Sequence, residues 1–377
     1  MKILYYYSKL KIGGAEKSTI RLMNYLVECG HEVTLLLRWD GELESWLNPQ
    51  IKCIHLKQSI ALFNKMGKLG DVLNHIWGML TLVFKEHFIL PRKEYDVVIS
   101  GLLGYNPEIL FKYLNTKCYM QMLRNDVSLT KQYGKTEYYM KEYGERFQAY
   151  LGVSKYVTDS FKKSYPTLAK RAYTFYNILP SINPLLKREC PIEYSKDDGV
   201  LKILTVCRLE EKSKGLLRMA NIAKKLNEEF QGKFQWYIVG DGQDRELFQK
   251  QIIEFGLENT MILCGSTKDP LPYYAYADLV AVLSYYEGLC GVVNEAKLMC
   301  RPLIATRFSG IDEQIVNGEN GIVVENNEEA IFDSMYKILQ YPESIKKYEV
   351  NGMPQKLLDN KRKIEDLVNL CFEIIDK

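Results

Sequence analysis

Short apolar runs alternate with segments of helical periodicity along this chain, and that alternation restricts its fold more than any other feature. Residues 2–8 (KILYYYS) form the first run. Residues 14–30 follow, with apolar side chains at helical spacing and a glycine placed to end a helix. Residues 31–38 (HEVTLLLR) then have the composition of a second strand. Strand–helix–strand units build a parallel sheet with helices on its faces, so we predict an α/β fold.

A second series of strands and helices begins near residue 200. The stretch 177–199 between the two series carries three prolines and no clear period, which is typical of a linker. A chain of 377 residues is also too long for one ordinary core. We therefore predict two tandem doubly wound Rossmann-like domains. The predicted segments are residues 1–178, residues 179–355, and a terminal helix at 356–377.

Charge and cysteine content limit the ligands and the cellular compartment that we expect for this chain. Residues 1–180 hold 25 Lys and Arg against 16 Asp and Glu, or +9, whereas residues 181–377 hold 25 against 31, or −6. Either the first half is drawn to anionic surfaces or substrates, or solvated surface charge simply fell unevenly. The nine cysteines form no C-x-x-C pair, which favours reduced cytosolic thiols over zinc or disulfides. The N-terminus resembles a strand and not a secretory leader, and the longest apolar run, residues 76–84, is shorter than the roughly 20 residues that span a bilayer.

The loops that follow the strands are the places to search for a site, because ligands bind beyond the carboxyl ends of strands in doubly wound sheets. Gly13 and Gly14 follow the first strand and precede a helix. Paired glycines let the backbone approach a ligand, and free N–H groups at a helix start favour an anion. The pattern is neither a G-x-G-x-x-G nor a G-x-x-x-x-G-K-[ST] motif. A plain tight turn is the simpler explanation.

Two cations follow the first strand of the second series. Arg208 comes directly after the apolar run, and Lys214 precedes the next helix. Both could converge on a strand-end crevice and hold a diphosphate. The alternative is a solvated loop in which Lys212 and Lys214 accompany Glu210 and Glu211, which fits Arg208 less well.

Residues 240–242 (GDG) follow the next strand of the series. Gly240 and Gly242 permit a tight loop there, and ordinary turn chemistry is enough to explain them.

Residues 284–300 (SYYEGLCGVVNEAKLMC) combine a strand end, a glycine-containing loop and a helix start. Glu287 lies in the loop and Glu295 in the first turns of the helix, whose N–H groups would point into the crevice. Burying two carboxylates in so apolar a stretch is costly unless something pairs with them. Helix capping is a fair alternative for Glu295 and a poorer one for Glu287.

These residues resemble a known family. The unit of Glu287, seven residues and Glu295, followed by RPLIAT and SG-x-x-E-x-I-x-x-G-x-x-G, is similar to the signature of retaining family-4 glycosyltransferases of the GT-B fold, of the bacterial glycan-assembly type. RL-x-x-x-x-KG, GGAEKS, LGVS and YNILP match other landmarks of that family in order. The resemblance covers nearly the whole chain, and its specific part lies in the second domain.

The resemblance implies an acceptor domain at residues 1–178 and a donor domain at 179–355 that face a central cleft, with the helix at 356–377 crossing back to the first domain. It also implies a role for each matching residue. Arg208 and Lys214 would hold the donor diphosphate, Glu287 would contact the sugar hydroxyls, and these three form the expected catalytic set. Glu295 would bind the ribose of the nucleotide. Backbone N–H groups near Cys290, Gly291 and Val292 would face the phosphates. The other positions implied are Gly240, Gly288 and Leu289 on the donor, and Gly13 and Gly14 on the cleft.

The sequence also departs from the family. Cys207 stands where many relatives have glycine, and Arg301 and Ser309 each replace a glycine. Relatives often carry a histidine on a first-domain loop near the reacting sugar, where this chain has QMLRNDVS. The residues that could act there on the acceptor or sugar are Arg124, Asn125 and Asp126.

The chemistry of sugar transfer fits this set. Negative charge grows on the leaving diphosphate, and cations with a helix start would stabilise it. We therefore expect no divalent metal and no cofactor, with the nucleotide sugar, a UDP-sugar by preference, as a substrate. No histidine lies in a motif, so a His-based triad is not expected. The family implies that the leaving phosphate accepts the acceptor's proton.

Residues 60–93 mix apolar and basic side chains. They could lie on a membrane surface or form a core helix pair of the first domain. With the basic first half, we expect a cytoplasmic protein, peripheral on the inner face of the cell membrane, that acts on a glycan or lipid-linked acceptor and not on nucleic acid. The competing functions are a sugar-nucleotide epimerase or phosphorylase on the same fold, and a non-catalytic partner subunit.

Overall fold

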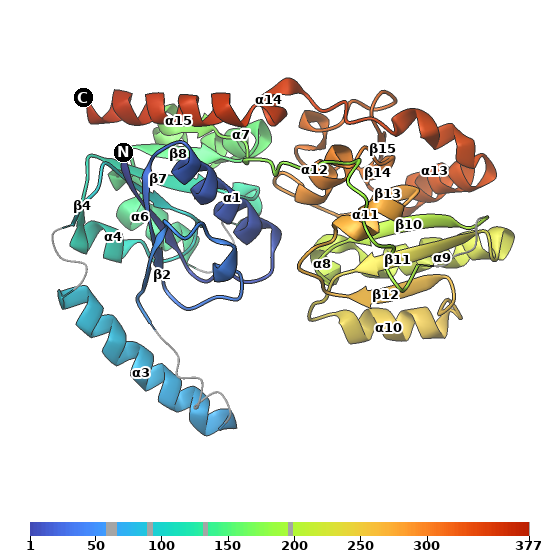
Figure 1. Cartoon of the computed structure of the whole chain (residues 1–377), viewed down its shortest axis with the longest axis horizontal. Coiled ribbons are helices and arrows are strands. Elements are labelled where there is room, and N and C mark those ends of the chain that lie inside the picture. Colours follow the sequence, from blue (N-terminus) through green and yellow to red (C-terminus); the bar gives the residue numbers. More distant parts are fainter. Residues whose placement is uncertain (58–65, 89–92, 131–134, 195–198, 377) are drawn as a thin grey trace. The chain divides into compact units, whose positions relative to one another are not determined.

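The computed structural model describes residues 1–57, 66–88, 93–130, 135–194 and 199–376 and divides the chain into two compact units (Figure 1). The first unit comprises Met1–Leu179 together with Asp359–Lys377, and the second comprises Pro180–Leu358. Each unit is built on its own parallel sheet flanked by helices. The predicted pair of doubly wound α/β domains is therefore confirmed.

The sheet of the first unit has seven strands in the order β3-β2-β1-β5-β7-β8-β9, all parallel. Strand order reverses beside β1, which pairs with β2 on one side and β5 on the other. Nearly every residue of β1 and β5 is buried, as expected for parallel strands covered on both faces. The strands are β1 (Lys2–Tyr7), β2 (Glu32–Leu37), β3 (Lys52–His55), β5 (Val97–Ser100), β7 (Cys118–Leu123), β8 (Ala149–Gly152) and β9 (Ala172–Thr174), with a separate parallel pair of β4 (Lys93–Glu94) and β6 (Leu114–Asn115).

Helix α1 (Gly14–Glu28) shows how the pattern of the sequence becomes structure in this unit. Its buried face carries Ile20, Met23 and Val27 at helical spacing. Gly30, with φ of +84°, ends the helical stretch as predicted, because glycine alone adopts this conformation without strain. The other helices of the unit are α3 (Gly67–Phe88), α4 (Glu108–Tyr113), α5 (Val127–Thr130), α6 (Thr136–Tyr143), α7 (Lys155–Ser164) and α15 (Asn360–Ile375).

The terminal helix α15 belongs to the first unit and packs against β7. The Asp359 carboxylate caps its start by accepting the N–H of Arg362 at 2.9 Å. The amide of Asn360 pairs with the backbone of Leu179, donating to its oxygen at 2.8 Å and accepting its N–H at 3.0 Å. Leu179, where the chain leaves the first unit, is thereby bonded to Asn360, which lies next to the point where the chain returns to it.

The sheet of the second unit has six parallel strands in the order β12-β11-β10-β13-β14-β15. The order reverses at β10, which lies between β11 and β13. The strands are β10 (Leu201–Val206), β11 (Phe234–Val239), β12 (Met261–Gly265), β13 (Leu279–Val282), β14 (Leu303–Thr306) and β15 (Ile322–Val324). The helices are α8 (Glu211–Lys214), α9 (Leu216–Phe230), α10 (Arg245–Glu254), α11 (Leu271–Tyr276), α12 (Gly291–Leu298), α13 (Glu328–Gln340) and α14 (Gln355–Leu358).

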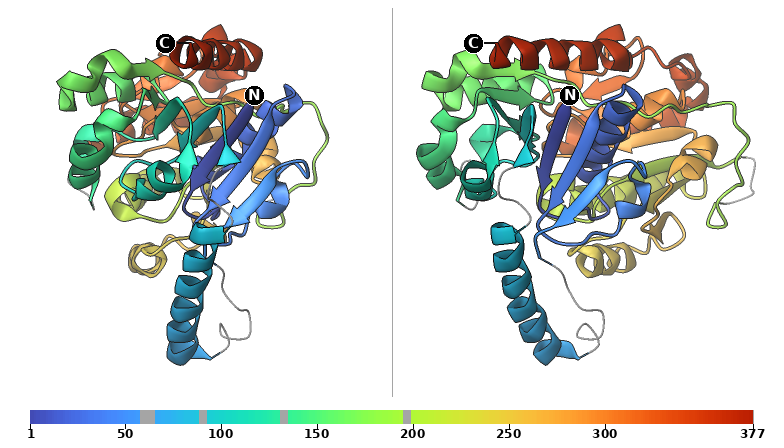
Figure 2. Two further views of the ribbon diagram at one scale, coloured as in Figure 1. Left: turned by 90° about the vertical axis from the view of Figure 1, so that its left-hand side faces the viewer. Right: turned by 60° about the vertical axis from the view of Figure 1, so that its left-hand side comes forward.

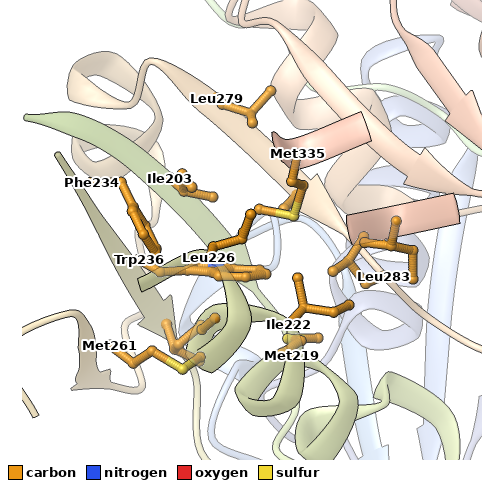
Figure 3. Close-up of a cluster of buried hydrophobic side chains, with 14 of the residues drawn as sticks. Ile203, Met219, Ile222, Leu226, Phe234, Trp236, Met261, Leu279, Leu283 and Met335 are labelled. Carbon is orange, nitrogen blue, oxygen red and sulfur yellow. The ribbon is translucent and has the colours of Figure 1, made fainter. Parts of the chain in front are cut away.

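Trp236 lies at the centre of the larger core of this unit, against Leu226 and Ile222 of α9 (Figure 3). Its indole N–H donates to Thr205 Oγ1 at 2.9 Å, and that hydroxyl donates to Ala281 O at 2.8 Å. The one polar atom of the tryptophan is thus satisfied inside the core, so burial of its large apolar surface stabilises the sheet without a desolvation penalty.

Helix α3 extends away from the sheet of the first unit (Figures 1 and 2). It packs inward through small and polar residues. A Cβ on Gly78 would lie 2.9 Å from Trp39, and Lys85 donates to His55 O. Leu82 also packs on the core of the first unit, but most of the large apolar side chains of α3 are exposed. The alternative of a core helix pair is therefore wrong for the described part of residues 60–93. None of the described helices is both long and apolar enough to cross a membrane.

Candidate active site

Most of the predicted donor residues lie in loops beyond the carboxyl ends of β10, β11 and β13 in the second sheet. Gly240 follows β11, and its φ is +151°. A Cβ at this position would lie 1.8 Å from the carbonyl oxygen of Cys207. Glycine is therefore required so that this loop can pack directly on the backbone that leads to Arg208, a support for the site that needs no ligand contact.

Lys214 at the end of α8 and Glu287 in the loop after β13 form an ion pair, in which Nζ donates to Oε1. Ser284 Oγ donates to the same oxygen at 2.8 Å. The lysine and glutamate side chains are 16% and 17% exposed, so water screens the pair only partly. Burial lowers the pKa of Lys214, but the Glu287 carboxylate more than offsets this and holds that pKa above its ordinary value. The lysine is therefore charged at neutral pH.

The second carboxylate oxygen of Glu287, Oε2, accepts no hydrogen bond from the described part of the chain. One oxygen is thus held by two donors while the other remains available. A carboxylate fixed in this way can accept a hydrogen bond from a substrate hydroxyl without first breaking its own contacts.

Arg208 follows β10 on the same edge of the sheet and is 71% exposed. Its guanidinium lies 4.0 Å from Glu210, whose carboxylate also accepts a short hydrogen bond from Ser213 Oγ. An exposed pair at this distance contributes little, about 0–1 kcal/mol, so Arg208 can exchange it for an anionic ligand. The solvated-loop alternative is wrong for Lys214, which pairs with Glu287 and is largely buried.

Two thiols lie close to the ion pair. Burial raises the pKa of Cys207 and of Cys290 to about 12, and the charges of Lys214 and Glu287 act on both thiols. Both cysteines are therefore neutral at physiological pH. A neutral buried thiol is a poor nucleophile, so cysteine-based covalent catalysis does not suit this site.

Helix α12 begins at Gly291, and Gln314 holds the residue before it. Cys290 N–H donates to Gln314 Oε1 at 3.1 Å, and Gln314 Nε2 donates to Cys290 O at 2.8 Å and to Asn294 Oδ1 at 2.7 Å. The expectation that Cys290 N–H faces a phosphate is therefore wrong for this structure. Its bond with Gln314 consumes the donor.

The residues on either side of Cys290 differ in how accessible they are to a ligand. Gly291 is exposed, and a Cβ there would meet no atom within 4 Å, so protein packing does not explain its glycine. Val292 is half-buried, whereas Gly288 and Leu289 are buried. Only the backbone of these two buried residues could meet a donor, and the predicted contacts of all four stay predictions.

Glu295 lies within α12 and is 9% exposed. Its Oε2 accepts a hydrogen bond from Tyr274 OH at 3.3 Å, and Tyr274 itself is fully buried on α11. The first turn of α12 contains no acidic residue, so Glu295 lies beyond the first-turn position at which acidic side chains stabilise a helix. Its predicted contact with a ribose stays a prediction.

The glycine pair of the first unit stands at the start of α1. Gly13 is extended, and a Cβ on it would lie 2.3 Å from Glu16 Oε2, so this carboxylate folds back over the helix start. A Cβ on Gly14 would meet nothing within 4 Å. An anion approaching this helix would therefore meet the negative charge of Glu16, which weakens the expectation of a simple phosphate-binding helix start.

Arg124, at the end of β7, donates all five of its N–H groups within the first unit, so its expected contact with a substrate is not supported. Its partners are Gly101 O, Ser18 Oγ, Asn177 Oδ1, Tyr5 OH and Thr19 Oγ1, at 2.8 to 3.3 Å.

Asn125 and Asp126, which follow Arg124, differ in how far their side chains are available to a substrate. Asp126 is buried, and its carboxylate accepts hydrogen bonds from Ser128, Ser160 and Tyr156. Burial raises the pKa of Asp126, but these bonds, led by that from Ser160, bring it below its ordinary value. Asn125 alone of the three is exposed, so it alone presents its side chain to solvent.

Sequence reasoning missed the side chains that hold the site from behind, chiefly Arg218, Gln314 and Tyr274. Arg218 lies among the apolar residues of α9 and is 2% exposed. A charged residue at an apolar position of a helix was the only signal in the sequence. Within the described residues, no group of three or more His, Cys, Asp and Glu side chains could hold a metal ion.

Residues 201–341 match the family model described as "Glycosyl transferases group 1". The match spans the loops after β10, β11 and β13 that are described above. A likeness over the whole chain is found with the GalNAc-α-(1→4)-GalNAc-α-(1→3)-diNAcBac-PP-undecaprenol α-1,4-N-acetyl-D-galactosaminyltransferase of Campylobacter jejuni. The two are 24% identical over 366 residues, which covers 95% of this chain and 94% of that protein.

Solved structures show the same two-domain architecture. Anabaena Alr3699/HepE in complex with UDP and glucose superimposes with a TM-score of 0.72 at 17% identity, covering 98% of this chain and 99% of that one. WaaG, a glycosyltransferase involved in lipopolysaccharide biosynthesis, gives a TM-score of 0.69 at 17% identity, covering 97% and 99%. These likenesses extend over both units, so the chain has the GT-B fold.

Proposed function

We propose that this chain, a glycosyltransferase of the family-4 type with the GT-B fold, moves a sugar from a UDP-sugar to a glycan or lipid-linked glycan with retention of configuration. The reaction would serve the assembly of a cell-surface polysaccharide. Glycan assembly is also the activity in the names of a Rhizobium meliloti lipopolysaccharide core glycosyltransferase and an Erwinia amylovora amylovoran glycosyltransferase, which match parts of this chain.

The observation that carries the proposal is the Lys214–Glu287 ion pair, with one free carboxylate oxygen, on the edge that also bears Arg208. A nucleotide sugar needs cations at its diphosphate and an acceptor for its sugar hydroxyls. Lys214 and Arg208 supply the first, and Glu287 Oε2 supplies the second. The remaining N–H groups of Lys214 can bind phosphate while its contact with Glu287 holds the two functions together.

Bond cleavage places negative charge on the leaving diphosphate and positive charge on the sugar ring. Arg208 and Lys214 stabilise the first charge, and the Glu287 carboxylate offsets the second. The leaving phosphate accepts the proton of the attacking hydroxyl, so the protein needs no strong base on the acceptor side. We propose that these residues also replace a divalent metal, and that transfer is insensitive to EDTA.

The acceptor is proposed to be anionic and lipid-linked. The name of the Campylobacter relative specifies a diphosphate-undecaprenol carrier for its own acceptor. The first 180 residues of this chain, which hold most of the first unit, have a charge balance of +9, which suits an anionic carrier.

Helix α3 supports a location on the inner face of the cell membrane. Its inward face includes Gly70, Asn74 and Gly78, whereas most of its exposed residues are large and apolar. An apolar helix face this wide is stable in water only if something covers it, and a bilayer interface suits a helix attached to a basic domain. The apolar side chains that it exposes are Leu69, Val72, Ile76, Trp77, Met79, Leu80, Val83, Phe84 and Phe88.

A thermal-shift panel of UDP, GDP, ADP and their sugars tests the donor. A nucleotide present at 100 times its Kd should raise the stability of the chain by about 2.7 kcal/mol. Transfer is then assayed with the donor that binds, with and without EDTA. Turnover that Arg208→Ala and Glu287→Ala both abolish supports the proposal. Absence of any nucleotide shift, or an epimerised nucleotide sugar as the product, would overturn it.

A further inference from the structure

Arg218 on α9 holds the loop that carries Glu287. The guanidinium donates through one terminal nitrogen to Leu283 O and through the other to Asn326 Oδ1 at 2.7 Å. Its central carbon lies 4.0 Å from the centroid of the Tyr285 ring. Leu283 and Tyr285 flank Ser284, whose hydroxyl donates to Glu287. One buried side chain therefore fixes both neighbours of the residue that orients the carboxylate.

Asn326 extends this support to the backbone of the loop. Its Nδ2 donates to Tyr285 O at 2.9 Å, so the amide bonds Arg218 and the loop at once. The N–H of Tyr285 donates to Ser213 O at 2.8 Å, and Ser213 precedes Lys214 in α8. Both members of the Lys214–Glu287 pair are thus tied to the same small framework of side chains.

The geometry of Arg218 favours a role beyond packing. Its Nε is buried and has no hydrogen-bond partner in the described part of the chain. An unpaired buried donor lowers stability, and a neutral side chain of similar length would avoid that loss. The planar guanidinium of an arginine, however, can donate to two separate oxygen atoms and stack on an aromatic ring at the same time, which a neutral side chain of that length cannot do.

We infer that Arg218 is a positioning residue of the donor site, which sets the orientation of Glu287 toward the sugar by fixing residues 283–285. The inference rests on the proposed function of that site. It separates two roles in the site: Arg208 and Lys214 bind the diphosphate, and the framework of Arg218, Asn326 and Tyr285 holds the Glu287 carboxylate in its orientation.

Arg218→Met is expected to lower kcat with the donor that binds in the panel by about 10- to 100-fold, since small misplacements of reacting groups have effects of this size. KM for the same donor should change by less than about threefold, because the groups that bind the diphosphate are untouched. Arg218→Lys, which keeps the charge but cannot make both contacts and the stack, should fall between wild type and Arg218→Met.

Hydrogen exchange reports the loop directly. The amide of Tyr285 should exchange at least about tenfold faster in Arg218→Met, with α9 amides unchanged. Lys225→Met is the matched control, since it removes an exposed charge two turns along the same helix. Asn326→Ala and Tyr285→Leu remove the two more exposed residues of the same framework. They replace Arg218→Met in these measurements if that variant does not fold.

Faster exchange at Tyr285 with unchanged kcat in Arg218→Met and Asn326→Ala would overturn the inference, since the residue would then be structural only. A KM that rises with no fall in kcat would overturn it as well. If the wild-type chain turned over no nucleotide sugar, the proposed function would fail instead, and unchanged exchange at Tyr285 would show separately that Arg218 does not hold the loop.

Discussion

Lys214 and Glu287 are 73 positions apart in the chain, yet the lysine Nζ donates to the glutamate Oε1 at the carboxyl edge of the second sheet. The contact joins the loop after β10 to the loop after β13, the two strands that lie side by side at the centre of that sheet. It places a cation beside a carboxylate, the two groups that the proposed transfer requires at the diphosphate and at the sugar.

Glu287→Gln keeps an acceptor but removes the charge. We expect transfer to slow about 10²- to 10³-fold, because stabilisation of the reacting charge is lost. The free energy of unfolding should fall by about 1–3 kcal/mol, because Lys214 is left largely buried without its anion. The double variant Lys214→Met/Glu287→Gln should recover most of that stability but no activity. Urea denaturation measures the coupling, and strictly additive losses would show that the pair is not coupled.

Gly291→Ala tests whether a ligand comes close to the start of α12. A methyl group there meets no protein atom within 4 Å, and alanine suits a helix, so stability should stay within about 0.5 kcal/mol or rise slightly. We expect UDP to bind at least about tenfold more weakly, because the methyl group would occupy the space of a phosphate near the backbone. Calorimetric titration measures this, with Gly199→Ala as control. Equal UDP affinity in the two variants would place the diphosphate elsewhere.

Gly240→Ala should be more damaging than any other glycine change in the site. A Cβ 1.8 Å from Cys207 O forces the backbone before Arg208 to move, so we expect a loss of more than about 3 kcal/mol. Gly256→Ala is the matched control, because Gly256 also has positive φ, +64°, but open space around it, and should lose only about 1–2 kcal/mol. Equal losses in denaturant melts would mean that backbone strain alone, and not the contact with Cys207, sets the cost.

Lys297 makes stability depend on pH above neutrality. It is fully buried on α12, and its Nζ donates to Tyr348 O at 3.0 Å. Burial lowers the pKa of this lysine to about 8 in the folded chain, against about 10.4 in the unfolded chain. Between these values the unfolded state binds more protons, so the free energy of unfolding should rise with pH, by about 2 kcal/mol from pH 7.5 to 9.5.

Lys297→Met should lack that rise, whereas Lys225→Met, which removes an exposed lysine, should keep it. Urea melts of the three proteins at both pH values measure the difference, since tyrosines and thiols titrate equally in all of them. Parallel pH profiles for wild type and Lys297→Met would show that the buried lysine does not lose its proton in this range.

Leu80→Glu with Phe84→Glu tests the membrane-binding role of α3. Both side chains are exposed in the absence of a membrane, at 60% and 55%, so folding should be unaffected. Binding to vesicles with anionic lipid should weaken at least about tenfold, since each apolar side chain contributes about 1.5–3 kcal/mol when buried. Co-sedimentation and the fluorescence of Trp77 report it, with Leu247→Glu on α10 as control. A concentration-dependent dimer that the double variant abolishes, without vesicle binding, would identify a second copy as the partner instead.

The fold was predictable because its signals are local. Continuous apolar runs predicted β1 and β10, because strands in the middle of a parallel sheet are buried on both faces. Apolar residues at helical spacing predicted α1 and α9, because these helices bury one face. Prolines marked residues 177–199, which contain the change of unit after Leu179.

The site was predictable only by residue type. Arg208, Lys214 and Glu287 were expected because cations and carboxylates followed apolar strands. Arg124 was expected at a substrate because it stands where relatives of the resembling family carry a histidine, yet all five of its N–H groups are used within the first unit. For α3 the composition allowed two outcomes, and only the packing of Gly78 on Trp39 determined which face turned outward.

The sequence by itself therefore determined the class of fold, the number of units and the loops in which the candidate site lies. Tertiary structure alone decided that Lys214 pairs with Glu287, that Gln314 takes the N–H of Cys290, and that Arg218 lies behind Ser284. The physical reason is that periodicity depends on residues close together in the sequence, whereas each of these contacts joins residues more than 20 positions apart. Such partners meet only after the sheet has brought its strand ends to one edge.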